Sequence, residues 1–303
     1  MLYPLSYRGA RRDSTLLKLR AFALLAALAS AAGVQAQSWA WDDGTTPFVV
    51  SPEVVVDRML RIAEVRATDY LIDLGSGDGR IVIEAAKRFG ARGLGVDIDP
   101  RLVELAREKA RSAGVEELAK FEVRDLFETD LHGASVVTVY LLPEVNRKLM
   151  PRLLDQLKPG ARVVSHDYDM GPWPFDEMIE IALTEKPVGP LGHSRIFLWV
   201  IPADARGKWL FDIPQHGGRW EFNVSQEYQV LEVAPRVAAG DLLMRAARMR
   251  GEEIRVVLTG VLRGKAWNYL FRGRLAAGRI EGEMRISDGE INRTYPWQAE
   301  RQQ

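Results

Sequence analysis

The chain has 303 residues with 41 acidic and 41 basic side chains, so bulk charge gives no reason to expect a nucleic-acid partner. Its 47% hydrophobic and 27% charged residues are typical of a globular protein, and its length predicts two domains or one domain with a sizeable addition. There is no cysteine, which excludes disulfides and thiolate metal sites, and the four histidines show no ligand spacing. We therefore expect no metal site.

Residues 1–36 have the three-part layout of a secretory signal peptide. An apolar run over residues 21–34 is preceded by five basic side chains, Arg8, Arg11, Arg12, Lys18 and Arg20. The run is shorter than the ~20 residues that span a bilayer, and Val34-Gln35-Ala36 predicts cleavage after Ala36. We expect an exported protein, periplasmic or extracellular, with no transmembrane span after cleavage. The alternative is an uncleaved anchor, which would still place the remainder outside the cytoplasm.

Residues 37–203 are predicted to form an α/β domain. Ser51-Pro52-Glu53 has the features of a helix start, with Ser51 as the N-cap. Apolar runs then predict strands at 70–74, 93–96, 121–123, 136–141 and around 163–164. The segments between most of these strands have helical spacing, at 81–89, 100–113 and from 143 to the Pro159-Gly160 pair. Strict alternation predicts a parallel sheet with helices on both faces and right-handed crossovers, and the runs 178–183 and 195–201 predict a hairpin at its edge.

Residues 204–303 are predicted to form a small all-β domain. Alternating apolar residues over 220–230, 253–261, 269–275 and 279–286 are separated by glycines, a pattern typical of a barrel or sandwich. The segment 242–250 fits either a short helix or another strand. Most of the aromatic residues are expected in the core, namely Trp209, Trp220, Tyr228, Trp267, Tyr269 and Trp297.

The turn after the first predicted strand carries the strongest functional signal, Gly75-Ser76-Gly77-Asp78-Gly79. Glycine lets the backbone approach a ligand closely and adopt positive φ, and the helix that follows offers free N–H groups to an anionic group. A dinucleotide fingerprint would need glycine where Arg80 stands. No Gly-Lys-Ser/Thr occurs, which excludes a P-loop.

Two further acidic residues follow the next two strands. Asp97 ends the second strand, where a carboxylate can accept both hydroxyls of a ribose. A carboxylate at this place can bind the ribose of NAD and of adenosyl ligands alike, so only the glycine spacing distinguishes these two classes of ligand. Asp125 follows the third strand directly. Asp99 precedes Pro100, which favours a role as a helix N-cap.

This arrangement resembles motif I of the class I, seven-β-strand S-adenosylmethionine (SAM) methyltransferases. The resemblance extends from the Pro47-Phe48-Val49-Val50-Ser51-Pro52 segment through Asp97-Ile98-Asp99-Pro100 and is closest to the small protein lysine methyltransferases, such as those that modify the mitochondrial ATP synthase c-subunit. It implies a Rossmann-like seven-strand sheet and SAM as the cofactor. It implies cofactor contacts from the loop, from the ends of the second and third strands and from the lead-in segment, at Asp73, Gly75, Ser76, Gly77, Gly79, Asp97, Ile98, Asp125, Leu126, Phe48 and Val49.

Candidate residues for the methyl-transfer step lie at the ends of the fourth and fifth strands. Tyr140 can hold a sulfonium or an amine against its ring face. His166 is the only histidine at the carboxyl end of a predicted strand and is a candidate base; a structural histidine is the alternative.

We therefore predict a SAM-dependent methyltransferase acting on a protein lysine amine or a small molecule. The alternative is an exported, non-catalytic module that binds an adenosyl ligand and uses its β domain to bind a partner. An NAD-dependent enzyme is disfavoured by Arg80.

Overall fold

The computed structural model describes residues 48–183, 192–238 and 240–302. The predicted signal peptide at 1–36 and the lead-in residues 37–47 lie outside the described residues, so export and cleavage stay predictions. Within the described ranges, no helix is long and apolar enough to cross a membrane.

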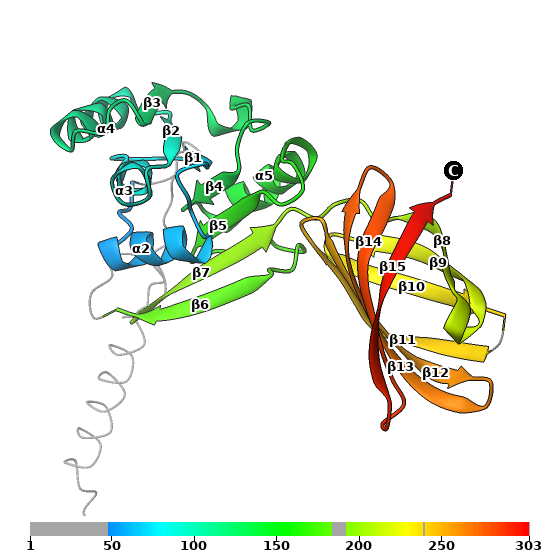
Figure 1. Cartoon of the computed structure of the whole chain (residues 1–303). Helices are drawn as coiled ribbons and strands as arrows, with labels where there is room; N and C mark the ends of the chain where they lie inside the picture. Colours follow the sequence, from blue (N-terminus) through cyan, green and yellow to red (C-terminus); the bar gives the residue numbers. More distant parts are fainter. Residues whose placement is uncertain (1–47, 184–191, 239, 303) are drawn as a thin grey trace, which may run out of the picture. The chain divides into compact units, whose positions relative to one another are not determined.

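The first half of the described chain forms a seven-stranded sheet with the order β3-β2-β1-β4-β5-β7-β6 (Figure 1). The strands are β1 (Tyr70–Leu74), β2 (Arg92–Asp97), β3 (Ala119–Val123), β4 (Val136–Val139), β5 (Arg162–His166), β6 (Glu177–Ala182) and β7 (His193–Val200). The first five strands are parallel, and β7 and β6 run antiparallel at one edge. The predicted parallel sheet and its edge hairpin are confirmed.

Helices cover both faces of this sheet (Figure 1). They are α2 (Glu53–Ile62), α3 (Arg80–Phe89), α4 (Pro100–Ser112) and α5 (Pro143–Gln156). Because side chains alternate along a strand, Leu71 and Val136 pack under α2, α3 and α4, whereas Ile72 and Val137 pack on the opposite face with α5. The strands are apolar on both faces for this reason.

Two helix starts were predicted, and the structure treats them differently. Asp99 caps α4 as expected, because its side chain accepts a hydrogen bond from the Arg101 N–H and Pro100 occupies the first turn. Ser51 does not cap α2: the helix begins at Glu53 after Pro52, with no side-chain cap. The Ser51 hydroxyl lies instead 2.9 Å from Nδ1 of His166, so a long-range contact replaces the local one.

The second half of the described chain forms a closed barrel with the order β10-β11-β12-β13-β14-β15-β8-β9 (Figure 1). Its strands are β8 (Gly207–Ile213), β9 (Gly218–Glu227), β10 (Val230–Val237), β11 (Gly240–Arg250), β12 (Glu253–Leu262), β13 (Lys265–Ala276), β14 (Arg279–Ser287) and β15 (Asn292–Arg301). The ambiguous segment 242–250 is strand, because it pairs along its length with β12. The predicted boundary between residues 203 and 204 falls between β7 and β8 and stays a prediction.

Aromatic side chains fill the barrel. Trp209, Trp220, Tyr269 and Trp297 are buried as expected, whereas Tyr228 and Trp267 are only partly buried. Many of the rings meet edge to face, the arrangement that aromatic quadrupoles prefer; Phe211 and Phe222, for example, are 4.7 Å apart between centroids. Side chains therefore fill the interior of the barrel, as in other small barrels.

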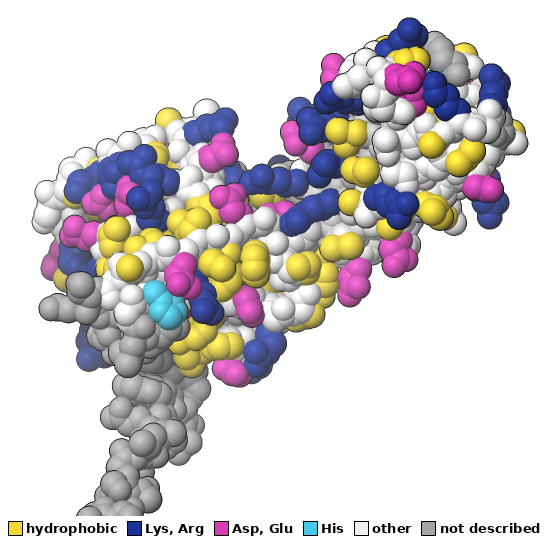
Figure 2. Space-filling view, turned by 90° about the horizontal axis from the view of Figure 1, so that it is seen from below, with side chains coloured by type: hydrophobic (Ala, Val, Ile, Leu, Met, Phe, Trp, Pro, Cys, Tyr) yellow, Lys and Arg dark blue, Asp and Glu magenta, His cyan; other side chains and the backbone are white. Residues whose placement is uncertain are grey.

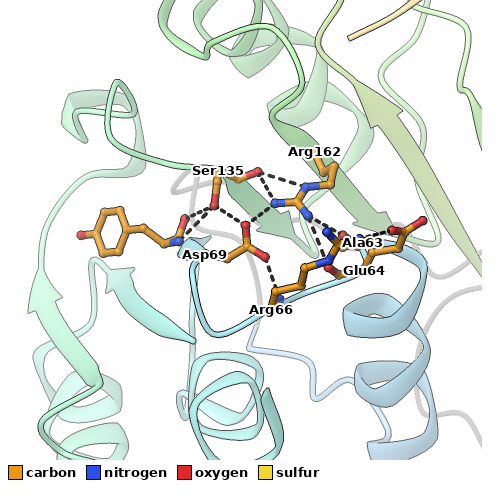
Figure 3. Close-up of polar contacts among 7 residues, drawn as sticks. Ala63, Glu64, Arg66, Asp69, Ser135 and Arg162 are labelled. Atoms are coloured by element: carbon orange, nitrogen blue, oxygen red, sulfur yellow. Dashed lines mark hydrogen bonds and ion pairs between the residues drawn. The ribbon is translucent and has the colours of Figure 1, made fainter. Parts of the chain in front are cut away.

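A polar cluster joins the amino ends of β1, β4 and β5 (Figure 3). Asp69, just before β1, accepts hydrogen bonds from the Ser135 hydroxyl and the Arg66 N–H, and it pairs with the Arg162 guanidinium. Arg162 also donates to the Ala63 carbonyl at 3.0 Å, which fixes the end of α2 to β5. Burial raises the pKa of Asp69, but these hydrogen bonds outweigh it and lower the pKa.

We expect Arg162→Ala to destabilise the fold strongly, because it leaves the Asp69 carboxylate buried without its cation. Breaking a buried pair in this way costs on the order of 3 kcal/mol. Arg66→Ala is the matched control: its side chain pairs with Glu64 on the surface, where both are about 70% exposed, and such pairs contribute ~0–1 kcal/mol. Urea unfolding of the two variants measures the difference, and equal losses would contradict this assignment.

Candidate functional site

The glycine loop lies at the carboxyl end of β1. Gly75, Gly77 and Gly79 all have positive φ, at 79°, 52° and 78°. A side chain at Gly77 would also collide with its surroundings, because a Cβ there would lie 2.5 Å from the Phe48 ring. The loop therefore needs glycine for both backbone conformation and close approach.

Asp97 joins the end of β2 to this loop. One carboxylate oxygen accepts the Gly77 N–H at 2.8 Å, and the other accepts the Asp99 N–H at 3.0 Å. Each carboxylate oxygen can accept more than one hydrogen bond, so acceptor capacity remains for ligand hydroxyls. The predicted ribose-binding carboxylate is thus held in a fixed orientation by the loop itself.

Two buried polar groups beneath the loop fit a bound cofactor. Ser76 is buried, and its hydroxyl has no hydrogen-bond partner in the described part of the chain. A buried polar atom without a partner is costly unless a ligand or water satisfies it. Asp73 is also buried and accepts the Thr138 hydroxyl at 2.7 Å. Burial raises its pKa to about 7, and the nearby charges of Asp97 and Asp78 add to the rise.

The remaining predicted cofactor residues lie at the ends of β2 and β3. Asp125 is exposed and caps the short helix η1 (Leu126–Glu128) by accepting the Phe127 N–H. Leu126 is partly buried and Ile98 is 67% exposed. Because β1, β2 and β3 are parallel neighbours, these residues and the glycine loop follow strands that end at the same edge of the sheet.

The lead-in segment is tied to the glycine loop. The Phe48 ring lies against Gly77, and Arg80 donates from Nη1 to the Ser51 carbonyl at 2.8 Å. Arg80 also makes a bidentate pair with Asp78, which in addition accepts a hydrogen bond from Lys109 at 2.6 Å. Asp78 therefore serves in an ion-pair cluster and does not cap α3, where Gly79 is the N-cap.

Burial acts on Asp78 in the direction opposite to these ion pairs. It raises the pKa of the carboxyl, but the hydrogen bonds from Arg80 and Lys109 outweigh it and lower the pKa to about 2. Asp78 is thus charged at neutral pH. Arg80, which disfavours a dinucleotide fingerprint, has a structural role of its own.

His166 and Tyr140 lie in contact at the ends of β5 and β4. Their ring centroids are 3.9 Å apart. His166 is fully buried, with Nδ1 2.9 Å from the Ser51 hydroxyl and Nε2 2.9 Å from the Ser194 hydroxyl. The Asp167 carboxylate also lies 3.4 Å from Nε2, so polar groups hold the ring on both sides, and the roles of His166 as a base or as a structural residue both stay predictions.

Asp167 is a site residue that sequence reasoning missed. It follows β5 directly, has φ of 64° and is buried. Its carboxylate accepts from the Tyr140 hydroxyl at 3.3 Å and from the Arg195 N–H at 3.1 Å. Burial raises the pKa of Tyr140, and the Asp167 charge raises it further, so this phenol stays neutral. The sequence feature that could have identified Asp167 is its place next to His166 at the carboxyl end of a predicted strand.

Two other side chains that follow these strands have partners of their own. Trp173 is buried, packs on Trp199 and donates its indole N–H to Gln229. Glu144 is exposed and pairs with Arg147 on the surface of α5. In the described ranges no three His, Asp or Glu side chains are grouped to hold a metal ion.

Sheet order, glycine loop and the Asp97 contact together define a class I SAM methyltransferase. A family model for the ANTKMT methyltransferase domain matches residues 73–177. A protein-lysine N-methyltransferase of Saccharolobus islandicus is 41% identical over 156 residues, which are 51% of this chain and 93% of that protein. The chain belongs to the same family of SAM-dependent methyltransferases as this archaeal protein.

Similarity extends to a mitochondrial enzyme and to a solved structure. The ATP synthase c-subunit lysine N-methyltransferase of Mus musculus is 36% identical over 130 residues, covering 43% of this chain and 52% of that enzyme. Among solved structures, an RNA methyltransferase from Salinibacter ruber in complex with S-adenosyl-L-homocysteine is 52% identical, with 52% and 95% of the two chains covered and a TM-score of 0.47.

The raised pKa of Asp73 predicts a pH dependence of stability. The folded state holds the Asp73 proton up to about pH 7, whereas the ordinary value is 3.8. The protonated Asp73 therefore contributes its full stabilisation at pH values below the unfolded-state pKa of 3.8. This stabilisation is lost as the pH rises through the folded-state pKa, at up to ~1.4 kcal/mol per pH unit. Asp73→Asn should flatten the fall in unfolding free energy between pH 5 and 7, measured by urea titration. Asp99→Asn, at a half-buried helix cap, is the control, and parallel curves for wild type and Asp73→Asn would contradict the raised pKa of Asp73.

Proposed function

We propose that this SAM-dependent methyltransferase modifies the ε-amine of a protein lysine. The proposal rests chiefly on the 41% identity to a protein-lysine N-methyltransferase that is covered over 93% of its length. The cluster at the ends of β4 and β5 supports it. Asp167 supplies a negative charge, and the rings of Tyr140 and Tyr168 lie 6.5 Å apart between centroids. Aromatic faces beside a carboxylate suit a cationic amine.

The cofactor would be held by residues from three strand ends. Asp97 would accept the ribose hydroxyls, and the Ser76 hydroxyl with the loop N–H groups would bind the aminoacid end near the amino terminus of α3. Asp125 and the N–H of Leu126 would contact the adenine, and Phe48 and Val49 would cover the ligand. The unpartnered hydroxyl of buried Ser76 is the observation that favours this placement.

The residues of the chain mainly align the acceptor amine and exclude water from it. Bound SAM would supply an electrophilic methyl group on a sulfonium, the acceptor nitrogen would take that methyl group, and S-adenosylhomocysteine would be the leaving product. Asp167 attracts the ammonium form of the lysine, which loses a proton to solvent before attack. Tyr140, neutral and oriented by Asp167, positions the nitrogen. Such alignment and desolvation can supply much of the rate without a strong base.

Asp97→Ala should weaken SAM binding to the full chain by roughly tenfold or more, because a loss of ~1–3 kcal/mol follows removal of a charged hydrogen-bond acceptor. Calorimetry measures the affinity. Asp99→Ala is the matched control, since that carboxylate caps α4 and should leave SAM affinity within about twofold. If Asp97→Ala binds SAM as tightly as wild type, Asp97 does not bind the ribose. If wild type does not bind SAM, the proposed methyltransferase activity is contradicted.

The acceptor can be identified by transfer of a labelled methyl group from SAM into cell fractions, followed by mass spectrometry of the labelled species. We expect label on lysine, with Asp167→Asn lowering kcat/KM for the acceptor by roughly tenfold at unchanged SAM affinity, since one charge-assisted contact contributes ~1.5–3 kcal/mol. Label in RNA, or in a small molecule alone, would exclude the lysine proposal. Running cytoplasmic and exported fractions separately also tests the predicted export.

A further inference from the structure

Three arginines stand side by side on the outer face of the barrel. Arg248 on β11 pairs directly with Arg255 on β12, which pairs directly with Arg272 on β13. All three are exposed. Neighbouring strands lie ~4.8 Å apart, and like charges directly opposite each other destabilise a sheet. We call these three residues the arginine row. The repulsion between their guanidinium groups would be relieved by a negative charge bound beside them.

Carboxylates stand at both ends of this row, because Glu283 of β14 lies directly opposite Arg272, and only Arg255 has an arginine on each side. Arg248 forms an ion pair with Asp176 at 2.7 Å. Across the residues that the structure describes, Arg255 and Arg272 have no ion pair or side-chain hydrogen bond with a carboxylate. Some other cations of the barrel pair with carboxylates, as Lys208 does with Glu221. Figure 2 shows such interspersed basic and acidic side chains over much of one face.

The arginine row borders a cavity of about 760 Å³. Two more arginines, Arg250 and Arg274, line the same cavity with two carboxylates, Asp176 and Glu253, and Arg274 also forms an ion pair with Glu252. Except for Asp176, the lining residues belong to β11, β12 and β13. A volume between roughly 300 and 1,000 Å³ is typical of sites for small molecules, whereas docking of a protein surface does not require such a hollow.

We propose that this cavity binds a small polyanion that carries at least two phosphate or carboxylate groups. Guanidinium groups bind both oxyanions in bidentate fashion, and guanidinium groups on adjacent strands can each take one group of the same ligand. The site is separate from the methyl-transfer residues, and the proposal does not depend on the identity of the methyl acceptor.

The test is calorimetric titration of the full chain with two probes, tripolyphosphate and citrate, at one fixed ionic strength. We expect saturable binding of at least one probe; the tighter one identifies the oxyanion. The double variant Arg255→Gln, Arg272→Gln should weaken binding at least tenfold. Arg285→Gln is the matched control, because that exposed β14 arginine bonds to Asn292 outside the cavity, and it should change the affinity less than twofold.

Two results would overturn the proposal: no saturable binding of either probe, or an equal loss of affinity in Arg285→Gln, which would indicate general attraction to a basic surface. The double variant Arg255→Lys, Arg272→Lys keeps the charge and removes the bidentate geometry, so it should lose affinity by an intermediate factor. If the glutamine variant does not fold, the lysine variant still tests whether Arg255 and Arg272 bind the polyanion. SAM affinity, measured in parallel, should be the same in all variants.

Discussion

The hydrogen bond from the Gly77 N–H to the Asp97 carboxylate is the contact on which the site depends. It links the turn after β1 to the end of β2, so one interaction positions both the glycine loop and the carboxylate that we propose to bind the ribose. The parallel pairing of β1 with β2 brings these two ends together, and the absence of side chains on Gly77 and Gly95 leaves room for the turn. A Cβ at Gly95 would lie 2.8 Å from Ser76 Cβ. Sheet topology, glycine placement and ligand chemistry thus constrain one another.

A second set of contacts joins the segment before α2 to the carboxyl end of β5 and to the start of α3. Ser51 bonds through its hydroxyl to His166 and through its carbonyl to Arg80. One residue before α2 therefore touches both the end of β5 and the start of α3. Ser51 thus connects the end of β5 with the helix that follows the glycine loop.

Much of this arrangement follows from local sequence. Alternation of apolar runs with helical periods predicted the parallel sheet, and the G-x-G-x-G spacing predicted three glycines at positive φ. Contacts between residues far apart were not predictable in the same way. Ser51 has the local signature of an N-cap, yet its hydroxyl partner lies over a hundred positions away. Asp167 gained its role from a positive φ and from the pairing of β5 with antiparallel β7. The β11 segment contains good helix formers, and pairing with β12 overrides that propensity.

Closure of the barrel has a consequence for the order of folding. The strand pair that completes it joins β8 to β15, with Trp209 opposite Arg301. The contacts of β1 to β5 form among residues that leave the ribosome well before β15 does. The catalytic sheet can thus assemble while the barrel still lacks its last strand and exposes the two edges that closure would remove. Non-local closure of this kind is slow, and domains form in the order of their synthesis. During that interval the barrel segment is the part of the chain most exposed to edge-to-edge association and to proteases.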